Sequence, residues 1–158
     1  QKAALTWLNK RNVLSQEVQT ERYYHKLFNS DGLRFSDQAA FKAKQHIGGA
    51  IVNLALDSSH PLTFGMPSTV AVMKNKPLAF ETNSAPFTVA GQYQDQLLSS
   101  GYMAQEYQRA FANKPAMIVE RKGKGAIVGL VDNMMFRNIW LGSDKVYANA
   151  LYFIQAAP

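Results

Sequence analysis

An almost continuous apolar run, Ala50-Ile51-Val52-Asn53-Leu54-Ala55-Leu56, constrains the fold of this chain more than any other feature. Gly48-Gly49 precedes the run, and the turn sequence Asp57-Ser58-Ser59-His60-Pro61 follows it. Apolar residues at nearly every position are typical of a strand that is covered on both faces. The run therefore predicts a strand in the middle layer of an α/β sandwich.

The remaining elements follow from hydrophobic periodicity and turn residues. Helices are expected at residues 1–10, 16–28, 37–46 (with Ser36 as N-cap), 103–112 and 143–154, and a short helical turn at 62–65. Further strands are expected at residues 69–73, 78–81, 87–90, 116–120 and 126–131. The last two strands flank Gly123-Lys124-Gly125 and predict a β-hairpin. The last helix has a broad apolar face, so we expect it to dock on a mixed sheet.

Length and composition limit the classes of chemistry. The chain of 158 residues fits one domain, and it contains no cysteine and only three histidines. Without cysteine there is no disulfide framework, thiolate zinc site, iron–sulfur cluster or cysteine nucleophile within these residues. The first residue is not methionine, so we expect the sequence to be part of a longer protein.

The distribution of charged residues indicates which kinds of partner the chain could bind. Lys and Arg number 17 against 11 Asp and Glu, for a net charge of +6, but the basic residues are scattered except at Arg121-Lys122-Gly123-Lys124. We interpret this quartet as a solvated hairpin turn, because no aromatic platform or basic helix face accompanies it. No nucleic-acid partner is predicted. No apolar run reaches the roughly 18 residues of a transmembrane helix, so no membrane span is predicted either.

Known catalytic patterns are missing. His25, His46 and His60 have no His or Glu at the spacing of three or four residues that places two metal ligands on one helix face. The Gly-x-Ser-x-Gly pattern of a serine nucleophile is absent, as are the glycine loops that bind nucleotide phosphates. The sequence therefore predicts no catalytic residue, no cofactor and no metal ligand in this chain.

Five residues remain as candidates for a pocket: Asp57, His60, Asp132, Arg137 and Trp140. Asp57 and Asp132 end two predicted strands, where α/β sheets collect functional groups, although both could simply cap turns. His60 either hydrogen-bonds its own turn or lines a pocket. Arg137 could bind a carboxylate, pair with Asp132 or stack on Trp140. Alternatively, Arg137 and Trp140 simply belong to a loop that packs on the sheet edge.

Two longer stretches go beyond general patterns. Residues 48–65 follow the pattern G-G-A-I … L-D-x-x-H-P-L-x-aromatic-G. Residues 123–153 are similar to G-K-G-x-V-I-x-x-x-D-x-x-x-F-R-x-x-W-x-G-x-x-K-x-x-x-N-A-L-x-F, with Ile127-Val128 in place of V-I. Together with residues 97–102, they resemble the C-terminal region of bacterial M14-family zinc carboxypeptidases. In that group a peptidase domain is followed by a domain similar to class I glutamine amidotransferases.

This resemblance implies a fold and a cellular setting. The fold would be a flavodoxin-like three-layer α/β sandwich with a mixed, mostly parallel sheet, a C-terminal β-hairpin and a helix, truncated at its N-terminal side. Residues 1–158 would form one amidotransferase-like domain at the end of a longer, secreted or periplasmic chain. Its partner would be the upstream peptidase domain, which would hold the zinc, or a second copy of the chain in a homo-oligomer.

The departures from the family decide the expected function. An amidotransferase needs a Cys nucleophile with His and Glu, and this chain has no Cys and no His-x-Glu after the hairpin. The leading hypothesis is therefore a non-catalytic accessory domain that serves stability, substrate presentation or oligomer contacts. The alternative is a module that binds a small ligand in a strand-end cleft around His60, Asp132 and Arg137. A third reading is an enzyme that needs a nucleophile upstream of Gln1.

Overall fold

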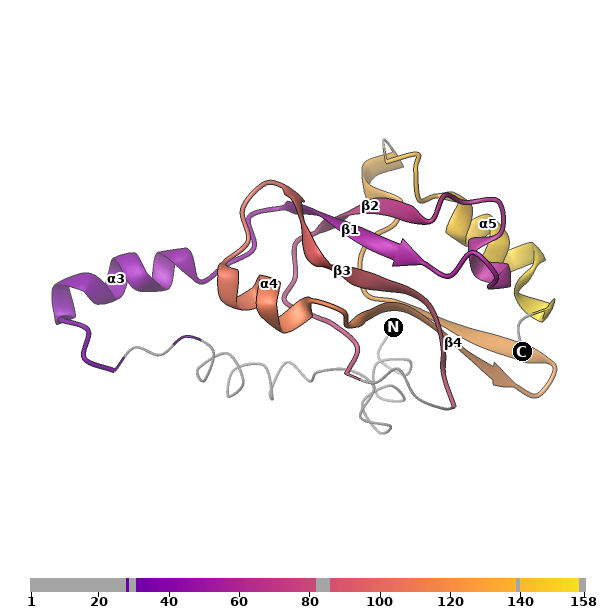
Figure 1. The fold of residues 1–158 in the computed structure, drawn as a ribbon, viewed down its shortest axis with the longest axis horizontal. Helices are drawn as coiled ribbons and strands as arrows, with labels where there is room; N and C mark the ends of the chain where they lie inside the picture. Colours follow the sequence, from indigo (N-terminus) through magenta and orange to yellow (C-terminus); the bar gives the residue numbers. More distant parts are fainter. Residues whose placement is uncertain (1–27, 29–30, 82–85, 139, 157–158) are drawn as a thin grey trace.

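A computed structural model describes residues 28, 31–81, 86–138 and 140–156 (Figure 1). Its strands are β1 (Ala50–Leu56), β2 (Thr69–Lys74), β3 (Thr88–Ser100), β4 (Pro115–Lys122) and β5 (Gly125–Leu130). Its helices are α3 (Phe35–Lys44), α4 (Gln105–Phe111) and α5 (Lys145–Tyr152), with the 3-10 turns η1 (Pro61–Thr63), η2 (Phe136–Asn138) and η3 (Ile154–Ala156). The helices expected at 1–10 and 16–28 lie outside the described residues, apart from Phe28.

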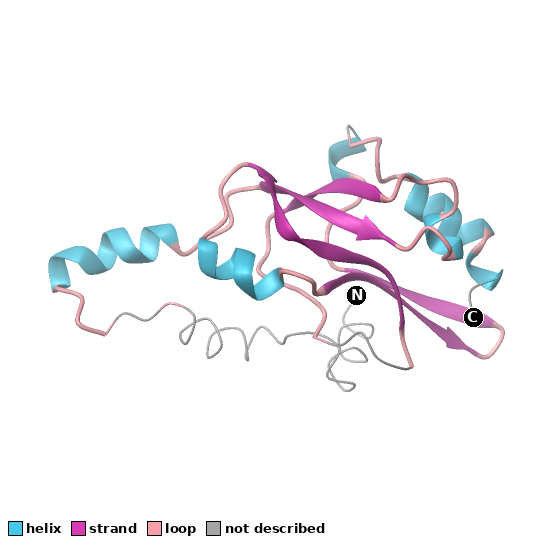
Figure 2. Cartoon of the chain, in the orientation of Figure 1, coloured by secondary structure: helices cyan, strands magenta, loops and turns pink. Residues whose placement is uncertain are grey.

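The strands form one curled antiparallel sheet in the order β2-β1-β3-β4-β5 (Figure 2). Every neighbouring pair is antiparallel. The expected flavodoxin-like sandwich with a mostly parallel sheet is therefore wrong. A parallel pair needs a helical crossover, and in the described residues the link from β1 to β2 contains only the short turn η1.

The burial of β1 shows why its sequence was misleading. Ala50, Val52, Leu54 and Leu56 are buried, whereas the three residues between them are only half-buried. Two of those three, Ile51 and Ala55, are apolar, so the run looked continuous although only one face is fully covered. Alternation of this kind is typical of an antiparallel strand with one face on the core.

Several elements were predicted correctly, and β3 was not. The predicted strand at 50–56 and the hairpin of β4 and β5 are confirmed, and β2, η1 and α4 lie at the predicted places. The predicted strand at 87–90 is only the start of the 13-residue β3. Its continuation is rich in Gln and Ser, and register shifts against β1 and β4 interrupt its alternation. Residues 78–81 form a loop with a single bridge position at Phe80.

The two outer helices differ from expectation in their packing. Helix α3 begins after Arg34 without a side-chain cap, so Ser36 lies inside the helix, and α3 has no buried residue. Figure 1 shows α3 extending away from the sheet. Of the expected apolar face of α5, Val146, Ala150 and Ile154 pack on the core, whereas Tyr147, Leu151 and Phe153 are exposed, so only half of that face docks. No helix in the described ranges is long and apolar enough to cross a membrane.

The core lies inside the curl of the sheet. Its fully buried side chains include Leu54 of β1, Tyr93 of β3, Met117 of β4 and Phe111 of α4. The sheet's outer strand β2 also meets the segment after β5, because Met73 forms an isolated antiparallel bridge with Asn133. The segment that follows β5 therefore lies against β2, although β2 and β5 do not pair with each other.

Candidate functional site

The five candidate residues lie in different parts of the fold. Asp57 and His60 follow β1, Asp132 follows β5, and Arg137 and Trp140 lie between β5 and α5. Three antiparallel pairings separate β1 from β5, so these two strands run in opposite directions. Their carboxyl ends therefore point to opposite ends of the sheet. The expectation that Asp57 and Asp132 share a strand-end cleft depended on parallel strands.

Asp57 organises the turn after β1. Its Oδ1 accepts hydrogen bonds from the Ser59 backbone N–H at 2.9 Å and from the Ser59 hydroxyl at 2.6 Å. The hydroxyl and the backbone N–H of Ser59 hold the pKa of the Asp57 carboxyl below its usual value. This arrangement is an Asx turn, in which a carboxylate replaces a backbone acceptor.

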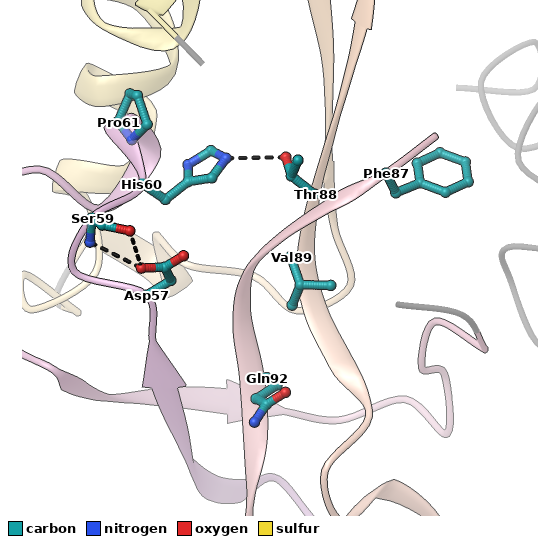
Figure 3. Close-up of a pocket in the computed structure, with 8 residues that line it drawn as sticks. All are labelled: Asp57, Ser59, His60, Pro61, Phe87, Thr88, Val89 and Gln92. Carbon is teal, nitrogen blue, oxygen red and sulfur yellow. Dashed lines mark hydrogen bonds between the residues drawn. The ribbon is translucent and has the colours of Figure 1, made fainter. Parts of the chain in front are cut away.

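The His60 ring is held at both nitrogens, and Figure 3 shows the contact with Thr88. The Leu62 backbone N–H donates to Nδ1 at 3.0 Å, and Nε2 lies 3.2 Å from the Thr88 hydroxyl oxygen. Since Nδ1 is an acceptor, these partners assign the neutral tautomer that carries its proton on Nε2. Thr88 in turn donates to the Val119 carbonyl at 3.3 Å. Burial lowers the pKa of His60, and the charge of Asp57 opposes this only in part.

A shallow groove of about 380 Å³ lies beside this turn. Its lining includes Asp57, His60, Thr88 and Gln92, which Figure 3 shows around one opening. Asp132, Arg137 and Trp140 do not line it. The groove therefore contains two of the five candidate residues and a wall from β3 that the sequence did not predict.

The state of His60 predicts a pH dependence of stability. Its folded pKa lies below the ordinary value of 6.5, so the unfolded chain binds the proton more readily. The stabilising contribution is complete above 6.5 and is lost as the pH falls from there toward the folded pKa. We expect the free energy of unfolding in urea to fall between about pH 7.5 and about pH 5.

A matched variant isolates this effect. His60→Asn keeps an acceptor for the Leu62 N–H but does not titrate, so its stability should fall less over the same pH range. An identical pH profile for the parent chain and the variant would show that His60 is not held neutral.

Asp132 belongs to a buried polar cluster that also contains Lys74 and Tyr93, which we call the closure cluster. The Lys74 ammonium lies 3.1 Å from Asp132 Oδ1 and donates to the Tyr93 hydroxyl oxygen and the Leu78 carbonyl, both at 2.7 Å. The Tyr93 hydroxyl donates to Asp132 Oδ2. Three distant segments, β2, β3 and the chain after β5, therefore meet at one network.

The cluster is withdrawn from solvent. The side chains of Lys74 and Asp132 are 0% and 3% exposed. The Lys74 ammonium lies 4.7 Å from the Tyr93 ring centroid and 4.8 Å from that of Phe111, so aromatic faces surround it. Burial lowers the pKa of Lys74 and raises that of Asp132, while their mutual attraction opposes both changes. The buried Lys74 ammonium is therefore held in place by three partners within the fold.

The sequence contains a pattern that could have identified Lys74 as a buried residue. In β2 the buried positions alternate as Val70, Val72 and Lys74, so the lysine continues the inward face of an apolar strand. A lysine at such a position requires a buried partner. Period-two alternation alone could therefore have marked Lys74, but not which carboxylate pairs with it.

Arg137 and Trp140 have separate contacts. The Trp140 indole N–H donates to the Ala71 carbonyl of β2 at 2.6 Å. Arg137 is exposed, has a left-handed φ of 52°, and its guanidinium lies 5.2 Å from the Phe136 ring centroid. Arg137 therefore stacks on Phe136 rather than on Trp140. Both contacts fit the alternative of a loop packed on the sheet edge.

The two stretches that carry the family resemblance contact each other. The buried amide of Asn149 donates to the carbonyls of Leu62 at 2.9 Å and Phe64 at 3.0 Å. The Lys145 ammonium donates to the Gly65 carbonyl at 3.0 Å. Gly65 has a φ of 64°, a left-handed conformation that favours glycine. Polar side chains of α5 thus fix the segment around η1.

In comparisons with known proteins, no family model, no curated protein and no solved structure matches this chain. Within the part of the chain that the structure describes, no group of three His, Cys, Asp or Glu side chains is placed to hold a metal ion.

Proposed function

We propose that the chain is a non-catalytic accessory domain of a secreted or periplasmic M14-type zinc carboxypeptidase. Zinc would be bound by the upstream peptidase domain, which would also be the main partner. Within the longer protein, the domain would contribute stability, substrate presentation or oligomer contacts. The resemblance of residues 48–65 and 123–153 motivates this proposal.

One observation carries the proposal: the polar residues of the matched stretches bind other parts of the same domain. Asn149 and Lys145 hold the backbone of residues 62–65, and Asp132 is buried against Lys74 and Tyr93. His60 uses both ring nitrogens within the fold. These side chains support an architectural role, because internal bonds already occupy their polar atoms.

A second candidate function is the binding of a small polar ligand in the groove at Asp57. It is favoured by the juxtaposition of Asp57, His60 and Gln92 around an open volume of about 380 Å³. The sequence had suggested a ligand cleft around His60, Asp132 and Arg137. Of these three residues only His60 lines the groove, so Asp132 and Arg137 have no part in it.

Two observations test the proposed function together. First, the complete gene should encode a His-x-x-Glu pair and a distant His upstream of Gln1. Second, the protein encoded by that gene should, when loaded with zinc, remove C-terminal residues from peptides. The chain of 158 residues, mixed with zinc and the same peptides, should show no turnover. Robust turnover by this chain, or an upstream sequence without a peptidase, would contradict the proposal.

A thermal-shift screen of sugars, amino acids and small carboxylates distinguishes the second candidate. A ligand of the groove would raise the unfolding temperature by mass action, and Gln92→Ala would abolish that rise.

A further inference from the structure

Helix α5 exposes apolar side chains where a surface helix ordinarily exposes polar ones. Leu151 and Tyr152 are 77% and 79% exposed, and Tyr147 is 36% exposed on the same helix. Phe64, at 59%, and Phe153, at 44%, extend this surface, because their ring centroids lie 5.1 Å apart. We call these five residues the α5 patch. Exposed apolar residues gathered on one short segment mark an interaction site more often than scattered single residues do.

Two basic side chains are fixed beside the α5 patch. The Lys145 ammonium donates to the carbonyl of Gly65, the residue after Phe64. The Arg121 guanidinium donates to the carbonyl of Gln155, two residues after Phe153, at 2.8 Å. The Phe64–Phe153 pair is therefore bracketed by two cations that are held in place by backbone hydrogen bonds.

The hairpin tip adds charge of the same sign. Lys122 and Lys124 are exposed at the turn between β4 and β5, next to Arg121. The acidic residues on the adjoining elements are Asp144, before α5, Asp57, whose Oδ1 is already bound by Ser59, and Glu120 of β4, which is buried. The rim of the α5 patch is thus predominantly basic, which matches the excess of bases in the whole chain.

The position of the α5 patch favours a flat partner. Figure 1 shows α5 and the β4–β5 hairpin at the same end of the molecule, away from α3. One flat surface could therefore contact the helix and the hairpin together. Two copies of the chain joined through this surface would instead bring like charges into contact, which disfavours self-association.

We propose that the α5 patch and its basic rim bind the surface of an anionic lipid bilayer. Leu151 and the aromatic rings enter the boundary between headgroups and acyl chains, while Arg121, Lys124 and Lys145 contact the phosphates. Apolar burial combined with attraction to anionic lipid is the mode by which peripheral proteins bind membranes. This inference is independent of the proposed accessory function, since it uses none of the resemblance.

Sedimentation of the 158-residue chain with vesicles tests the inference. Vesicles of phosphatidylcholine and phosphatidylglycerol in equal parts should bind the chain, and vesicles of phosphatidylcholine alone should bind it at least about tenfold more weakly. Raising the salt concentration to about 0.5 M should weaken the binding, because exposed charges are screened.

Variants locate the binding surface. Leu151→Ser combined with Tyr152→Ser should weaken binding about tenfold or more, and Lys124→Glu about fivefold or more. Phe35→Ser is the matched control, because Phe35 is 90% exposed on α3, and it should leave binding unchanged. All of these side chains are exposed, so each variant should keep the parent's unfolding temperature.

Three results would overturn the inference. The first is equal binding to the two kinds of vesicle, and the second is binding that survives the Leu151 and Tyr152 replacements. The third is concentration-dependent self-association in analytical ultracentrifugation that the same replacements abolish, since a second copy would then cover the α5 patch.

Discussion

Replacing Asp132 by alanine is expected to lower the free energy of unfolding by about 3–5 kcal/mol. The Lys74 ammonium is fully buried and would lose its carboxylate partner, and the Tyr93 hydroxyl would lose its acceptor. An uncompensated buried cation is among the most destabilising changes that a single substitution can produce. Urea unfolding followed by circular dichroism measures this change.

The chain offers a matched control for Asp132. Glu81 forms an ion pair with Lys114 at 3.1 Å, but the two side chains are 37% and 21% exposed. Because water screens this pair, Glu81→Ala should cost less than about 1 kcal/mol. If Asp132→Ala were no more destabilising than Glu81→Ala, the closure cluster would not stabilise the fold.

Replacing Asn149 by alanine should cost about 2–3 kcal/mol. The side chain is 1% exposed, and its amide is the donor to the carbonyls of Leu62 and Phe64. Removing it leaves two acceptors without their partner and weakens the attachment of α5 to the segment around η1. The same urea unfolding experiment measures this cost.

Asn75→Ala is the control for Asn149, because Asn75 is exposed after β2 and its replacement should change stability by less than about 0.5 kcal/mol. A loss at Asn149 no larger than at Asn75 would mean that the amide does not hold the two matched stretches together.

Local patterns predicted local structure well in this chain. The strand at 50–56, the hairpin around Gly123 and the helix that became α4 each depend on nearby residues, and the structure confirms them. The direction of strand pairing does not depend on nearby residues. Apolar Ile51 and Ala55 on the less covered face of β1 suggested two covered faces, and the error in the sheet followed from that.

In the candidate site, too, local features were predictable from the sequence and long-range contacts were not. The turn around Asp57 and His60 was predictable as a turn, because Asp, Ser and Pro supply its hydrogen bonds and dihedral angles. The partner of Asp132 was not predictable, since Lys74 lies 58 positions away in sequence. Only the curl of the sheet brings β2 to the end of β5. Long-range polar pairs of this kind depend on the topology, and the predicted parallel topology was wrong.

Our central claim is that Lys74 and Asp132 interact directly and so hold the segment after β5 against β2. A double-mutant cycle with Lys74→Met, Asp132→Leu and the combined variant tests it most directly, with free energies of unfolding measured in urea. We predict that the combined variant is more stable than the sum of the single losses implies, with a coupling of about 2 kcal/mol or more. Losses that add to within about 0.5 kcal/mol would contradict the claim.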